Sequence, residues 1–568
     1  MNGYNSIGEF IDAPNTVDFI AQNSEYFIEY IKDKPYIYPT TVLTGGYLVS
    51  YVDKSYIDDV IIDLGSSFVS SESFVCGLMG YQALEASGII QVQQQPFLDL
   101  RGQGVLVGIV DTGIDYTLDI FKYEDGTSKI VGIFDQTVRG TVPYNLSIGT
   151  EYTQEMINEA LASDNPYSIV PQTDTVGHGT FLASIAAGRE IDNFIGAAPD
   201  SELLIVKLKK ARSYYLEKYL IPPEQDNVFE SSAIMVGVEY ILKKAQELGR
   251  PVVICLGVGT NLGGHDGFTL FEEYLSKISS LTGICLCTAA GNESQARHHM
   301  QGTIAKEDES QNIELRIGDN PTDVYMTVWN NAPDRLSVSI KSPTGELVGR
   351  VPAKTGTRYE AKLVLERATV IVEYIFPTRG NGGQLTVIKL ISATPGIWTI
   401  IVYGDLILNG EYHTWLPITN FISPNVEFLT PNPNYTIVVP GTAIGPITCG
   451  GYNSLDNSLY PQTSWGPTRL PSMSPDFVAP AVDVEGYFPT GIGRMSGTSV
   501  ANAITAGAAA LMLQWGIVEK NDIALSTYQI RAYLIRGATR AEGLIYPNTQ
   551  WGYGRLNLIQ SFILMREV

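Results

Sequence analysis

Three short motifs, in a fixed order along the chain, constrain its fold most strongly. They are Asp111-Thr112-Gly113, Gly177-His178-Gly179-Thr180 and Gly497-Thr498-Ser499-Val500-Ala501. Together they supply a carboxylate, an imidazole and a hydroxyl, the three groups that convert a serine into a nucleophile. Because unrelated folds arrange these groups in different chain orders, the order Asp, His, Ser narrows the choice of fold.

Continuous apolar runs place the first motif at the end of a buried strand. Residues 105–110, 252–256 and 284–290 are apolar on both faces, as the central strands of a parallel sheet are. The first run ends at Asp111, at the sheet edge where open α/β proteins carry functional groups. Since His178 and Ser499 each open a helix-like segment, we predict an α/β fold, a parallel sheet flanked by helices.

The pattern changes several times along the 568 residues, which are too many for one ordinary core. Residues 1–95 predict a small α+β domain, and the α/β pattern covers residues 96–304 and 433–568. Between these parts, residues 305–432 hold short strands and frequent turns, which indicate an inserted all-β domain of the sandwich or jelly-roll type. An insertion also explains why Asn292 and Ser499 lie 499 − 292 = 207 positions apart.

Composition excludes several classes of partner. The formal net charge of −23 argues against nucleic acid, whose phosphates need a basic surface. Residues 496–518 carry no charge but are rich in small side chains, so we predict a buried helix there and no membrane span. The amino terminus shows no basic region followed by an apolar run, and we therefore expect cytoplasmic synthesis without a signal peptide.

Cysteine and histidine usage argues against a catalytic metal. The five cysteines lie mostly inside apolar runs, which is typical of small core residues in a reducing compartment. No CxxC pair and no HExxH motif is present. We assign His298 and His299 a surface or packing role, and we expect Glu272 and Glu273 to belong to a solvated face.

The three motifs resemble the signature blocks of the subtilisin-like serine proteases, the subtilases. Further agreement comes from Ala289-Ala290-Gly291-Asn292, from Ser464-Trp465-Gly466 and from residues 475–480. The resemblance covers about residues 96–302 and 435–568 and implies a subtilisin-like parallel sheet with an α+β prodomain. The resemblance implies no cofactor. Calcium binding stays an open alternative, for which we assign no ligand residues.

The resemblance also implies the role of each site residue. Ser499 would be the nucleophile, His178 the general base and Asp111 the orienting carboxylate, while the side-chain amide of Asn292 would bind the oxyanion. We expect substrate-binding contacts from a set of five residues: Gly257, Val258, Gly259, Ala290 and Gly291. Subtilases usually carry Ser-Leu-Gly in the substrate wall, so the stretch Leu256-Gly257-Val258-Gly259 is a departure that leaves side-chain preference open.

By the same resemblance, residues 1–95 would be a prodomain that assists folding and plugs the cleft with its carboxyl end. We predict self-cleavage in the polar stretch that closes this domain, at a bond within Ile90, Gln91, Val92, Gln93, Gln94 and Gln95. Cleavage before Pro96 is not expected, because its ring nitrogen is a poor leaving group.

A narrower resemblance rests on the inserted β-domain and the Gly- and Asn-rich stretch 259–267. It is to the clostridial germination-specific proteases of the Csp type. This implies a prodomain retained in the cleft, a jelly-roll insert, a cortex-hydrolase zymogen as protein substrate, and packaging in the spore. Two functions stay open: an endopeptidase that processes itself and a zymogen, or a silent or prodomain-blocked subtilase-like sensor or scaffold that acts by binding. The intact triad favours the first.

Overall fold

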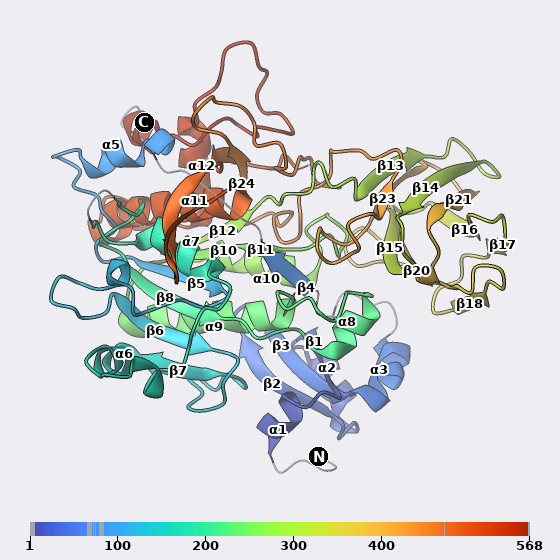
Figure 1. Ribbon diagram of the computed structural model, residues 1–568, viewed down its shortest axis with the longest axis horizontal. Helices are drawn as coiled ribbons and strands as arrows, with labels where there is room; N and C mark the ends of the chain where they lie inside the picture. Colours follow the sequence, from blue (N-terminus) through green and yellow to red (C-terminus); the bar gives the residue numbers. More distant parts are fainter. Residues whose placement is uncertain are drawn as a thin grey trace.

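The computed structural model describes residues 6–64, 71, 73, 75–78, 85–191, 194–470 and 472–565. It has three parts (Figure 1): a central α/β body, an amino-terminal α+β domain below it, and a β-rich domain that projects to the right. The body forms from two stretches of chain that flank the β-rich domain, so that domain is an insertion.

An eight-stranded sheet forms the centre of the body. In spatial order it contains β25 (Phe477–Pro480), β24 (Ile447–Tyr452), β12 (Ile284–Ala289), β10 (Val252–Leu256), β5 (Leu106–Asp111), β8 (Glu202–Lys207), β6 (Ile130–Asp135) and β7 (Thr150–Thr153). Every neighbouring pair is parallel except β6 and β7. The three apolar runs form β5, β10 and β12, which confirms the predicted α/β fold.

Helices cover both faces of this sheet. One face carries α7 (His178–Ala187) and α11 (Thr498–Leu513), and the other carries α9 (Ser231–Leu248) and α10 (Leu270–Ile278). Every residue of α11 is buried. By length and composition the stretch Thr498–Val518 could cross a membrane, but 89% of its most apolar window is buried inside the protein. It is therefore a core helix, as its small side chains predict.

The amino-terminal domain is an antiparallel sheet with short helices. It contains β1 (Thr16–Gln22), β2 (Ile37–Leu43), β3 (Tyr47–Asp53), α1 (Ile7–Ile11), α2 (Glu25–Lys32) and α3 (Ile57–Leu64). The domain rests on α9 and α10: Thr44 donates two hydrogen bonds to Glu239, and the ring of Tyr47 packs edge-on against Tyr274.

The insert is a sandwich of two antiparallel sheets that share one apolar core. The larger sheet holds β13 (His299–Thr303), β22 (Glu411–Trp415), β15 (Thr322–Asn330), β20 (Gln384–Ala393), β19 (Thr369–Ile375) and β18 (Arg358–Lys362). The smaller holds β17 (Leu347–Val351), β16 (Arg335–Lys341), β21 (Gly396–Leu406), β14 (Ser310–Ile317) and β23 (Glu427–Phe428). The sandwich starts at His299, before the boundary at residue 305 drawn from the sequence.

The remaining elements lie around the body. They are α5 (Ile89–Gln93), α6 (Gln154–Leu161), α8 (Ser213–Lys218), α12 (Thr527–Gly537), α13 (Leu558–Met565), the hairpin β26 (Val484–Phe488) and β27 (Gly491–Met495), and the short strands β4 (Val75–Leu78), β9 (Phe229–Glu230) and β11 (Val258–Gly259).

Candidate active site

The structure brings together the carboxylate and the imidazole of the first two motifs. Asp111 is the last residue of β5, and His178 is the first residue of α7. The Nδ1 atom of His178 lies 2.8 Å from Oδ1 of Asp111, and both residues are buried. A carboxylate at this distance holds the imidazole in one tautomer and stabilises its protonated form.

Two features of the chain before His178 set its position. Gly177 has a φ of 84°, a left-handed conformation that favours glycine and that turns the chain into α7. The carboxylate of Asp174 then accepts four hydrogen bonds, from the main-chain N–H groups of Val176, Gly177 and Thr180 and from the Thr180 hydroxyl. Asp174 is thus a positioning residue for the first turn of the histidine helix. Asp174 matches no motif of the sequence, and its place four residues before His178 is the one signal of its role.

The hydroxyl of the third motif completes the triad. Ser499 is the second residue of α11, and its Oγ lies 3.1 Å from Nε2 of His178. The preceding Gly497 has a φ of 151°, a region of backbone space that only glycine readily occupies. Because Ser499 lies in the first turn, the positive end of the α11 dipole is close to the place where an oxyanion would develop.

Asn292 lies beside Ser499 with its amide group oriented. Its Oδ1 accepts hydrogen bonds from the N–H of Thr498 at 3.1 Å and from the Thr498 hydroxyl at 3.2 Å. These two bonds hold the side-chain carbonyl of Asn292 against Thr498, so its NH₂ group points away from Thr498. Among the described residues Nδ2 of Asn292 has no hydrogen-bond partner, so it is available as an oxyanion donor.

One oxygen of the triad carboxylate has no donor. Oδ1 of Asp111 accepts from His178 and from the N–H of Thr112, whereas the buried Oδ2 has no hydrogen-bond partner in the described part of the chain. A Cβ atom added to Gly257 would lie 3.0 Å from this oxygen. Subtilases usually carry a serine at the position of Gly257. This chain lacks that serine hydroxyl at the place where Oδ2 of Asp111 has no hydrogen-bond donor.

A short strand lies along the predicted substrate wall. In β11, Val258 and Gly259 pair antiparallel with Leu78 and Gly77 of β4. The other edge of β4 pairs antiparallel with β9, so β4 is the middle strand of three. Addition of a peptide strand to an exposed sheet edge is one recurring mode of peptide recognition. The part of the amino-terminal domain that occupies the wall is therefore residues 75–78, a segment that the sequence analysis did not single out.

This placement corrects the position expected for the carboxyl end of the amino-terminal domain. Residues Ile89–Gln93 form α5, which packs against α13 near the carboxyl terminus and away from β4 (Figure 1). Ile89 and Val92 are fully buried, and the Gln93 amide donates to the carbonyls of Gly196 and Ala197. The stretch 90–95 is thus held in the body and is not placed in the substrate wall.

Ala290 and Gly291 lie beside the site, but their main-chain groups are already used. The N–H of Ala290 donates to Cys449 and its carbonyl accepts from Val438. The N–H of Gly291 donates to the Thr498 hydroxyl, and its carbonyl accepts from Ser464. These two residues can offer surface to a substrate, but not the main-chain hydrogen bonds that an extended peptide needs.

The four other histidines gather at the root of the insert. His298 lies 3.0 Å from Glu293, next to Asn292, and His299 is within 3.1 Å of His413. All of them are buried, so the surface alternative for His298 and His299 is wrong and the packing role holds. In the parts of the chain that the structure covers, no group of three or more His, Cys, Asp or Glu side chains is arranged to hold a metal ion.

Comparison with known proteins agrees with this geometry. The model of the subtilase family matches residues 102–314 and 420–554, so the chain belongs to that family, whose members are subtilisin-like serine peptidases. The structure is also similar to that of the CspB protease of Clostridium perfringens, with 32% sequence identity and a TM-score of 0.76 over 85% of this chain and 96% of that one. This match confirms the resemblance to the Csp-type proteases.

Other matches are weaker. The structure of a cold-adapted subtilisin-like serine proteinase has 14% identity and a TM-score of 0.38, over 81% of this chain and 90% of that one. The protease domain of PatA has 14% identity and a TM-score of 0.42, over 82% of this chain and 98% of that one. No curated protein sequence matches the chain.

Proposed function

We propose that this subtilase is a serine endopeptidase that cleaves its own prodomain and then activates a protein zymogen by limited proteolysis. One observation carries the proposal: β4 lies as a substrate-like strand on the wall formed by β11, beside a complete triad. Ser499 attacks the scissile carbonyl, and His178 takes the hydroxyl proton and then gives it to the leaving amine. Asp111 orients the imidazole, and Asn292 donates to the oxyanion.

We place the self-cleaved bond between Leu78 and Glu85. Leu78 pairs with Val258, the residue after Gly257, and a Cβ built on Gly257 would lie 3.0 Å from Asp111 and 3.2 Å from His178. From Ala86 onward the chain is attached to the body: the Ala86 carbonyl accepts from the Tyr452 hydroxyl, and α5 follows. A cut between these two points separates the prodomain and leaves α5 with the enzyme.

A buried ion cluster supports retention of the cut prodomain. Asp18 of β1 is fully buried, and its Oδ1 lies 2.5 Å from the guanidinium of Arg212, which also pairs with Glu230. Burial alone would raise the pKa of Asp18, but the charges of Arg212 and Lys209 outweigh it and hold that pKa below its usual value. Departure of the prodomain would therefore leave Arg212 and Lys209 with Glu230 as their one remaining anion in this cluster.

The test compares the native full-length chain with Ser499→Ala, reading chain masses and new amino termini by mass spectrometry. We expect the native chain to arrive as two tightly associated fragments with a new terminus between residues 79 and 85, and Ser499→Ala to arrive intact. A cleaved Ser499→Ala chain would falsify self-processing, and a new amino terminus at one of residues 91 to 95 would place the cut in the stretch predicted from the sequence.

The presence of β4 in the wall also favours a second candidate, a prodomain-blocked subtilase that acts by binding. A fluorophosphonate probe separates the two, because it labels Ser499 only if the triad is active and accessible. Self-processing followed by labelling after mild release of the prodomain supports the enzyme. Self-processing with no labelling under any condition supports the sensor or scaffold.

The substrate class rests on resemblance to the germination-specific proteases. We propose the zymogen of a spore-cortex-degrading hydrolase as substrate and the spore as the location. The experiment incubates the processed enzyme with such a zymogen and with a variant zymogen whose propeptide linker is replaced. Cleavage of the first alone is expected; indiscriminate cleavage of both, or of neither, contradicts the assignment.

A further inference from the structure

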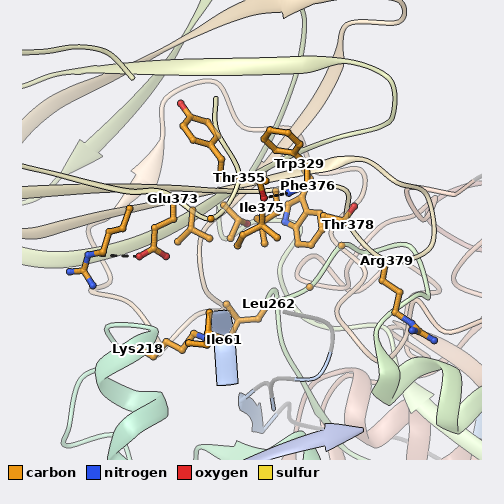
Figure 2. Close-up of a pocket in the computed structure, with 18 of the residues that line it drawn as sticks. Ile61, Lys218, Leu262, Trp329, Thr355, Glu373, Ile375, Phe376, Thr378 and Arg379 are labelled. Carbon is orange, nitrogen blue, oxygen red and sulfur yellow. Dashed lines mark hydrogen bonds and ion pairs between the residues drawn. The ribbon is translucent and has the colours of Figure 1, made fainter. Parts of the chain in front are cut away.

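The inserted sandwich meets the rest of the molecule in an outer and an inner region. In the outer region a cavity of about 590 Å³ lies between the larger insert sheet and α3 of the amino-terminal domain (Figure 2). Trp329 and Phe376 of the insert line it, and Ile61 and Leu262 lie opposite them. The inner region is the root of the insert, where buried polar groups of insert and body bond to each other. Because the root follows Asn292 directly in the chain, its contacts bear on the active site.

Glu293 is the residue of the root that stands next to Asn292. It is buried, and its carboxylate contacts three separate segments of the chain. Oε1 accepts from the main-chain N–H of Thr419, in the loop after β22, at 3.0 Å. Oε2 lies 3.0 Å from Nδ1 of His298 at the start of the insert, and it accepts from the side-chain amide of Asn261 in the body at 3.4 Å. The insert therefore supplies two of the three contacts that hold this side chain.

The main chain on both sides of Asn292 is bound to one further residue, Ser464 of the body. The N–H of Ser464 donates to the carbonyl of Gly291 at 2.8 Å, and its hydroxyl accepts from the N–H of Glu293 at 3.0 Å. A displacement of Glu293 would loosen the second of these bonds. It would then also move the Asn292 side chain, which is attached to the same short stretch of main chain.

From these contacts we infer that Glu293 is a positioning residue for the oxyanion donor, and that the insert holds Asn292 in place through it. The inference rests on the proposed proteolysis, in which Nδ2 of Asn292 donates to the oxyanion. Such a donor is effective only within about 2.7–3.1 Å of the developing charge, so a small displacement lowers the rate of the chemical step. Glu293 acts through Asn292 and takes no part in the making or breaking of bonds.

The rate of self-processing measures this role without a separate substrate-binding step, because the cut bond belongs to the same chain. Glu293→Gln keeps the shape of the side chain but replaces one oxygen with an NH₂ group, which cannot accept from His298 or Asn261. We expect self-processing to slow about tenfold, whereas loss of the donor itself in Asn292→Ala costs roughly 10²- to 10³-fold. Pulse labelling of the full-length chains and separation of the fragments give the first-order rates.

The double variant Asn292→Ala/Glu293→Gln distinguishes positioning from a general structural role. If Glu293 acts through Asn292, the double variant processes as slowly as Asn292→Ala alone, within about twofold. Independent effects would instead multiply and slow it by roughly a further tenfold. That outcome overturns the inference even if Glu293→Gln alone is slow.

Glu366→Gln is the matched control. Glu366 is 5% exposed, as Glu293 is, but its carboxylate accepts from Thr344 and Thr394 within the insert. This variant should process at the native rate, and unfolding temperatures show whether the two substitutions destabilise the chain equally. If both variants slow processing equally, a weakened insert explains the effect and the role of Glu293 is wrong.

Failure of the proposed function looks different from failure of this inference. A native chain that never cleaves itself contradicts the proteolysis and, with it, any role in positioning an oxyanion donor. A native chain that cleaves itself while Glu293→Gln keeps the native rate contradicts only the role of Glu293.

Discussion

The amino-terminal domain and the inserted sandwich both lie outside the eight-stranded body, yet they are joined to it by different forces. The first shares an apolar core with α9 and α10, and to this it adds buried charges around Asp18 and the strand β4. The second is continuous with the body at both ends and is fixed by stacked rings, where Trp415 lies parallel to His265 at 4.2 Å. The buried charges are stabilised only while the amino-terminal domain and the body stay together. The stacked rings of His265 and Trp415 instead extend the core where the insert joins the body.

The largest effect is expected at the ion cluster of the prodomain. Asp18→Ala leaves Arg212 and Lys209 with one buried anion fewer, which costs about 3–5 kcal/mol. The cut prodomain should then bind roughly 10²- to 10⁴-fold more weakly. Affinity capture through a carboxyl-terminal tag, followed by quantification of the co-purified prodomain, measures this.

The control for this change is Asp63→Ala. Asp63 is an exposed prodomain residue paired with Lys34, and exposed pairs contribute little. Its prodomain should co-purify as in the native protein. If the Asp18→Ala prodomain is retained equally well, β4 and the apolar contacts hold the domain. Buried charges would then not distinguish its attachment from that of the insert.

The next effect concerns the root of the insert. Trp415→Ala removes a buried ring between His265 and His299, so we expect the free energy of unfolding to fall by about 3 kcal/mol. Retention of the prodomain should not change. Denaturant unfolding and the same co-purification assay test the two statements, with Trp415→Phe as the milder variant. If Trp415→Ala released the prodomain and left the free energy of unfolding unchanged, the stacked rings would hold the prodomain and would not stabilise the insert.

The smallest effect is a pH dependence in α10 of the body, where Glu272 contacts Thr269 and Thr442. Glu272 of α10 is fully buried, and burial raises its pKa to about 7. Because the folded state keeps this proton to higher pH than the unfolded state, the contribution of Glu272 to stability is greatest in acid and falls as the pH rises through 7. The slope is at most about 1.4 kcal/mol for each pH unit.

Glu272→Gln is neutral at every pH, so it should remove this slope. Unfolding midpoints of the variant and of the native chain between pH 5 and 8 provide the measurement, with Glu273→Gln on the same helix as the matched control. An unchanged slope in Glu272→Gln would show that other groups titrate there.

The triad could be predicted because each of its residues stands at a local junction. Asp111 ends an apolar strand, and His178 and Ser499 each begin a helix behind a glycine. Local patterns therefore locate the site, and the parallel sheet brings the pieces together.

What lies in the substrate wall could not be predicted, because it depends on distant pairing. The four residues of β4 bind edges near residues 229 and 258, which no local pattern connects. The stretch 90–95 resembles an exposed linker because it is rich in glutamine, yet Gln93 uses its amide to satisfy two buried carbonyls. Glu272 was similarly expected in solvent, although it closes a capping box with Thr269 and is buried.

The position of β4 between two strands limits what can take its place. β9 pairs with Val75 and Cys76, and β11 pairs with Gly77 and Leu78, so the main-chain groups of β4 are used along its whole length. A helix cannot replace such a strand, because it already uses its own main-chain groups. A target must therefore present an unfolded linker several residues long, and a compact domain would have to unfold locally before it could enter. For the endopeptidase that we propose, this pairing makes the flexibility of the target a condition for cleavage.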